Sequence, residues 1–177
     1  PDASLPFFAV DLVPSWSPDG RTIAFGRRFA SSLGPPGLYV VDVQGGVPRF
    51  IVRGDNFWPQ SIQFSADSHR LVAANLLQLV IADLRTGVVT QPIYVNNGVS
   101  YADWAPDGES VLYGRAMYFP CCEPPDSGGV HILDLVRGID RPLTDQIGVV
   151  RSTDAIWLPD GKHIAHGDLR QGEVSAV

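Results

Sequence analysis

A short segment that ends in an aspartate-centred turn occurs four times in this chain, and the spacing of the copies constrains the fold more than any other feature. The copies span residues 14–20, 61–68, 102–108 and 154–161, and three of them contain Pro-Asp-Gly. They recur at intervals of roughly 40 to 50 residues, which is the length of a four-stranded propeller blade. The repeat therefore predicts an all-β chain, a β-propeller of four-stranded antiparallel blades.

Local chemistry explains each turn. Proline presets φ, the aspartate side chain caps the turn, and glycine accepts the positive φ that closes a hairpin. We therefore interpret Asp19, Asp107 and Asp160 as turn residues and not as catalytic carboxylates. The aromatic residue before each turn is expected to fill the space between blades. These aromatics are Trp16, Phe64, Trp104 and Trp157.

The residues after each turn predict the remaining strands of a blade. An apolar second strand is expected at residues 22–26, 70–74, 110–114 and 163–167, and a third at 38–42, 79–83 and 130–134. A more polar fourth strand follows near residues 48–52, 89–93 and 140–143. The result is a single domain over residues 1–177, with blades at 14–55, 58–95, 100–145, and 153–177 completed by 5–10.

Composition excludes several classes of protein. The chain is 45% hydrophobic, which is incompatible with a disordered chain, and its 18 glycines and 15 prolines suit short strands joined by tight turns. A net charge of −6 without a run of basic residues argues against a nucleic-acid partner. No apolar stretch approaches the ~20 residues of a membrane span. The start at Pro1 suggests a processed or trimmed polypeptide.

The repeat resembles that of TolB-type, WD-like propellers. The resemblance is strongest at residues 14–46, which contain WSPDGRTIAF (16–25) and LYVVDVQGG (38–46), and it covers nearly the whole chain. The second copy departs from the pattern, because residues 65–68 (SADS) lack both proline and glycine. The resemblance implies a periplasmic, extracellular or otherwise extracytoplasmic protein that binds another protein as a non-enzymatic scaffold. It also fits the propeller portion of a prolyl-oligopeptidase-like hydrolase, or an accessory subunit of a membrane-associated complex.

The two chain ends each lack a strand that the other supplies. Residues 153–177 give at most three strands, and Leu5 to Val10 lies where a fourth should be, so we expect this segment to close the last blade. Propellers of the resembled type usually carry six or more blades. The chain is therefore a four-bladed ring, half of a larger ring made by self-association, or part of a longer protein.

Two insertions interrupt the repeat between the second and third strands of their blades, at residues 27–37 and 115–129. Loops on a rigid scaffold concentrate binding residues, and aromatics beside arginine are typical of interface anchors. The candidate partner-binding residues are Arg27, Arg28, Phe29, Arg115, Met117, Tyr118 and Phe119. The alternative is that each insertion folds over its own blade and covers an apolar patch.

No catalytic, metal or cofactor site is expected. Cys121 and Cys122 are adjacent and lack zinc-binding spacing, so they are free thiols or a strained vicinal disulfide. His163 and His166 should point to opposite faces of a strand, and His131 and His166 take the places of packed aromatics. The sequence contains no phosphate-binding or dinucleotide-binding motif.

Overall fold

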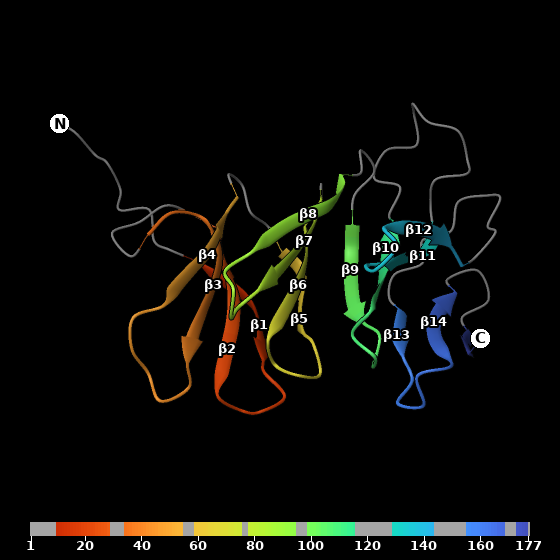
Figure 1. Cartoon of the computed structure of the whole chain (residues 1–177), viewed down its shortest axis with the longest axis horizontal. Helices are drawn as coiled ribbons and strands as arrows, with labels where there is room; N and C mark the ends of the chain where they lie inside the picture. The colour runs from red at the N-terminus through yellow and green to blue at the C-terminus, as the bar shows by residue number, and fades with distance from the viewer. Residues whose placement is uncertain are drawn as a thin grey trace.

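The computed structural model describes residues 10–28, 34–54, 59–75, 78–94, 99–115, 129–143, 155–168 and 173–176, and every regular element in them is a β-strand (Figure 1). The all-β class is thereby confirmed. None of these residues lies in a helix long and apolar enough to cross a membrane.

The strands form four antiparallel sheets that follow one another in chain order. The first contains β1 (Asp11–Trp16), β2 (Thr22–Arg27), β3 (Gly37–Asp42) and β4 (Arg49–Arg53). The second contains β5 (Pro59–Phe64), β6 (Arg70–Asn75), β7 (Gln78–Asp83) and β8 (Val89–Tyr94). The third contains β9 (Val99–Trp104), β10 (Ser110–Arg115), β11 (Gly129–Asp134) and β12 (Ile139–Pro142). The fourth contains β13 (Ala155–Trp157), β14 (Ile164–Asp168) and β15 (Glu173–Ala176).

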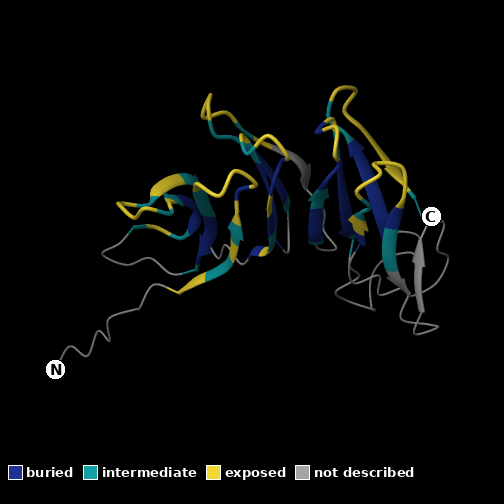
Figure 2. Cartoon of the chain, turned by 90° about the horizontal axis from the view of Figure 1, so that it is seen from below, coloured by how far each residue is buried: buried dark blue, intermediate teal, exposed yellow. Residues whose placement is uncertain are grey.

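The sheets stand side by side in a row, with the first and fourth at opposite ends (Figures 1 and 2). The opening strands of successive sheets make the contacts along the row, from β1 to β5, β5 to β9 and β9 to β13. A closed ring is not seen in the part of the chain that the structure describes. The expected closing strand at residues 5–10 falls almost wholly outside the described residues, as does Val177, so the pairing of the ends stays a prediction.

Neighbouring sheets pack through apolar side chains at repeated register positions. We call the face turned towards the preceding sheet the front face, and the opposite one the back face. Phe64 and Leu71, on the front face of the second sheet, pack against Ala24, Leu38 and Val40 on the back face of the first. The equivalent cluster between the second and third sheets includes Val72, Leu79, Ile81, Trp104 and Val111. The core is therefore distributed between the sheets, where Figure 2 shows the buried strands.

Trp16 corrects the expectation that every repeat aromatic fills the space between blades. It is 61% exposed, whereas Phe64 is 7% and Trp104 is 5% exposed. The reason is its position: these aromatics lie on front faces, and no sheet precedes the first one among the described residues. Trp157, on the fourth sheet, is half-buried against the third.

The repeated aspartates build the turns, as the sequence predicted. Asp19 Oδ1 accepts hydrogen bonds from the Ser17 hydroxyl at 2.6 Å and the Arg21 backbone N–H at 3.0 Å. These bonds hold the pKa of Asp19 below its usual value, the Ser17 bond contributing most. Equivalent backbone bonds reach Asp67 from His69, Asp107 from Glu109 and Asp160 from Lys162. The turn aspartates therefore have a structural role.

A polar network lies on the front face of the third sheet. The Tyr113 hydroxyl donates to Asp140 Oδ2 at 2.8 Å, and His131 Nδ1 lies 3.3 Å from Asp140 Oδ1. Tyr113 and His131 take the register positions that Phe25 and Tyr39 hold in the first sheet. His131 is buried, which confirms that it is a packed residue, and burial lowers its pKa although Asp140 acts in the opposite direction.

We expect Trp104→Ala to lower the free energy of unfolding by about 3–5 kcal/mol, because it empties a packed site between two sheets. Trp16→Ala is the matched control, since it removes the same side chain from the same register position. In dilute solution it should cost less than about 1 kcal/mol, as exposed positions do. Urea denaturation measures both. Equal losses would contradict the assignment of front-face packing.

We expect the pH dependence of stability to depend on His131. Because its pKa in the folded chain lies below the ordinary value of 6.5, the unfolded chain binds a proton that the folded chain does not. Stability is therefore fully present above pH 6.5 and is lost as the pH falls from 6.5 towards the folded-state pKa. Urea unfolding across this range should show a smaller loss of stability for His131→Tyr. This variant places a tyrosine at the register position where the first sheet has Tyr39. A wild-type stability that rises on acidification relative to the variant would mean that Asp140 outweighs burial.

Candidate functional site

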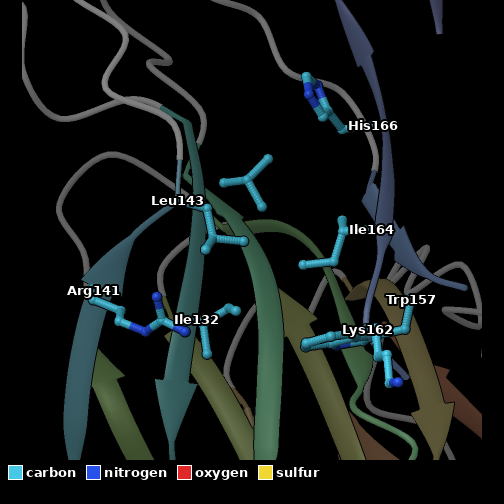
Figure 3. Close-up of a pocket in the computed structure, with 8 residues that line it drawn as sticks. Ile132, Arg141, Leu143, Trp157, Lys162, Ile164 and His166 are labelled. Atoms are coloured by element: carbon cyan, nitrogen blue, oxygen red, sulfur yellow. The ribbon is translucent and has the colours of Figure 1, made fainter. Parts of the chain in front are cut away.

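A cavity of about 240 Å³ lies between the third and fourth sheets (Figure 3). β11 and the region around β12 form one wall, and β14 with the β13–β14 turn forms the other (Figure 3). The lining residues are Val130, Ile132, Arg141, Leu143, Trp157, Lys162, Ile164 and His166. The cavity therefore lies where one blade packs on the next.

The floor of the cavity is apolar because of strand alternation. Val130 and Ile132 are two residues apart on β11, so both project from the back face of the third sheet. Leu143 lies beside them, since its backbone N–H donates to the Val130 carbonyl at 2.8 Å. Ile164, buried on the front face of β14, faces this wall. Such a surface favours an apolar guest.

The polar groups around this floor are all basic or imidazole side chains. Arg141 is exposed and lies opposite Ile132 in the β11–β12 register, while Lys162 belongs to the β13–β14 turn. His166 lies at the other end of the β14 wall (Figure 3). None of the eight lining residues is acidic, although the chain as a whole has a net charge of −6. The charged side chains at the cavity are therefore positive, which is electrostatically favourable for a negatively charged group nearby.

Trp157 connects the cavity to the third sheet. Its backbone N–H donates to Asp103 Oδ2 at 3.0 Å, and burial raises the pKa of that carboxyl. Its indole Nε1 is buried and has no hydrogen-bond partner among the described residues. The corresponding Trp104 Nε1 donates to the Gln63 carbonyl at 3.2 Å. Within the described residues, the contact between the third and fourth sheets therefore lacks the indole hydrogen bond that the preceding contact has.

None of the predicted binding residues that the structure describes lines this cavity. Phe29, Met117, Tyr118 and Phe119 lie outside the described residues. Arg28 and Arg115 are half-buried, at or just beyond the ends of β2 and β10, with the second sheet between them. They are not brought together.

Arg27 is 3% exposed and fully engaged. Its Nε and Nη2 donate to the two carboxylate oxygens of Asp11 at 2.8 Å each, and its guanidinium lies 4.6 Å from the Tyr39 ring centroid. A bidentate pair of this kind fixes β1 against β2. In this structure Arg27 holds the first sheet together and is not displayed to a partner.

Sequence reasoning missed the residues around the cavity. Arg141 lies in a polar fourth strand and Lys162 in a turn, and neither position departs from ordinary surface composition. Among the lining residues, the sequence predicted that Trp157 fills the space between blades and that His166 is packed; both are half-buried and line the cavity. Among the described residues, no three His, Cys, Asp or Glu side chains are grouped closely enough to hold a metal ion.

Comparison with known proteins supports the architecture. No protein-family model and no curated protein sequence matches the chain. The β-propeller domain of Cps50 (Swd1) from Myceliophteria thermophila matches with a TM-score of 0.68 at 15% identity, over 97% of this chain and 57% of that one. TolB from Acinetobacter baumannii matches with a TM-score of 0.65 at 20% identity, over 95% and 43%. Hydrazine synthase from Kuenenia stuttgartiensis matches with a TM-score of 0.64 at 21% identity, over 89% and 43%.

These matches confirm the fold that the repeat predicted. The chain spans about half the length of the solved structures that it matches. These structures are of proteins of different kinds, and at such low identity the likeness extends to the fold alone. The chain has the β-propeller architecture found in TolB and in WD-like propellers.

Proposed function

We propose that this chain is a protein-binding propeller module that acts outside the cytoplasm as a scaffold, by holding a partner and not by catalysis. The TolB-like fold supports a binding role, because the TolB-type propellers that the repeat resembles bind other proteins. The cavity between the third and fourth sheets is the observation that carries the proposal.

The cavity fits an apolar side chain that has a carboxylate beside it. An engineered apolar cavity of about 150 Å³ in another protein holds benzene, so about 240 Å³ leaves room for a side chain of phenyl or leucyl size. Arg141 and Lys162 would then lie next to the acidic group of the same segment. The partner feature is an apolar residue followed or preceded by Asp or Glu, presented by a loop or an extended strand.

The experiment is a selection of displayed random peptides on the immobilised chain. We expect the enriched peptides to place a large apolar residue next to Asp or Glu. Isothermal titration with one enriched peptide then compares the wild type with Arg141→Glu, which should weaken binding by at least about 30-fold if Arg141 belongs to a hot spot.

Arg49→Glu is the matched control. Arg49 lies opposite Val40 in the first sheet, as Arg141 lies opposite Ile132 in the third, so the two reversals change the same register position by the same charge. Arg49→Glu should leave the peptide affinity within about twofold of the wild-type value. Equal effects of the two reversals would show that overall charge, and not the cavity, governs binding. Enrichment of basic peptides would contradict the proposal outright.

A further inference from the structure

A hollow of about 400 Å³ lies between the first and second sheets, at the end of the sheets where the aspartate turns are. The first sheet lines it with the β1–β2 turn, the end of β3 and the start of β4. The second sheet lines it with the β5–β6 and β7–β8 turns. Three arginines from three of these segments line the same hollow: Arg21, Arg49 and Arg85.

The repeat does not require arginine at these three positions. Arg21 and Arg85 each lie two residues after a turn aspartate and donate a backbone N–H to it. Arg49 pairs with Val40 in the β3–β4 register. At the next contact, between the second and third sheets, the same three positions hold His69, Val136 and Thr90. The same turns and strands form there without arginine, so folding does not explain why three guanidinium groups gather at one contact.

Two of the three guanidinium groups have no acceptor in the part of the chain that the structure describes. Arg49 Nη2 donates to the Leu84 carbonyl at 3.4 Å, across the contact between the two sheets. The side chains of Arg21 and Arg85 take part in none of the hydrogen bonds or ion pairs among the described residues. Arg21 lies on the first sheet and Arg85 on the second, so they approach the hollow from both sides.

The two carboxylates of the lining are engaged by their own turns. Asp19 Oδ1 accepts hydrogen bonds from the Ser17 hydroxyl and the Arg21 backbone N–H, and Asp42 Oδ1 accepts one from the Gln44 backbone N–H at 2.7 Å. Three arginines against two aspartates leave the lining with a positive charge, although the chain as a whole has a net charge of −6. Such a lining attracts an anion.

We infer that this hollow binds a small molecule that carries a phosphate monoester. A phosphate monoester has a charge of about −1.5 to −2 at pH 7 and three acceptor oxygens, which suits two guanidinium groups. A carboxylate has one charge and two oxygens, and a single arginine satisfies it. The aliphatic residues Val47 and Leu84 also line the hollow and contact the carbon part of the ligand. A volume of about 400 Å³ is within the range of small-molecule sites.

The test is isothermal titration of the 177-residue chain with phenyl phosphate, and with benzoate as a carboxylate of similar size. Phenyl phosphate should bind with a dissociation constant of about 1 mM or below, and benzoate at least about tenfold more weakly. Arg21→His and Arg85→Val each introduce the residue that the next contact has at that position, so both variants should keep the fold. Each should weaken phenyl phosphate binding by at least about tenfold. Circular dichroism establishes that both variants retain their strands.

Arg137→Thr is the matched control. Arg137 lies in the β11–β12 turn of the third sheet with its side chain 73% exposed, and Thr86 holds the same turn position in the second sheet. The change removes one positive charge away from the hollow, so the affinity for phenyl phosphate should stay within about twofold of the wild-type value.

Three results would overturn the inference. An equal loss of affinity in Arg137→Thr and Arg85→Val would show that net charge governs binding. Benzoate that binds as tightly as phenyl phosphate would contradict the choice of ligand, and phenyl phosphate that shows no saturable binding to the wild type would contradict the site. The peptide selection reports on the cavity between the third and fourth sheets, so the two proposals fail independently.

Discussion

The fold depends on the packing of the front face of each sheet against the back face of the sheet before it. A four-stranded sheet buries little by itself, and most of the fully buried side chains lie between sheets. Small and aliphatic residues such as Ala24 and Val72 form each back face, and an aromatic residue covers them from the next sheet. The strands, turns and cavity all take their positions from this repeated contact.

Two features of the structure follow from places where this contact changes. Between the third and fourth sheets, where the first strand β13 has only three residues, the cavity lies beside Trp157. At the first sheet the contact has no preceding partner among the described residues, so Trp16 is exposed although its counterparts are buried. The same kind of side chain is thus part of the core in one repeat and exposed in another.

The second aspartate turn forms without the proline and glycine that flank the aspartate in the other repeats. In the second repeat Ser68 replaces the glycine of the turn and adopts a φ of 62°, a conformation that residues other than glycine rarely take. Asp67 nevertheless accepts the hydrogen bonds from Ser65 and His69, and Ser68 Oγ accepts one from the Asp19 backbone of the preceding repeat. The fold keeps its register there because the local hydrogen bonds offset the backbone strain.

The sequence by itself determined the strands, the turns and the propeller type, because these depend on local patterns: Pro-Asp-Gly turns, apolar alternation and a regular period. It also indicated that His131 is packed, from its place in the repeat. It could not determine that Arg27 forms an ion pair with Asp11, or that Arg141 and Lys162 line the same cavity. Both arrangements bring together residues from separate parts of the chain. Nor could it separate Trp16 from Trp104. The two residues have the same local sequence environment, and only the presence of a neighbouring sheet decides which one is buried.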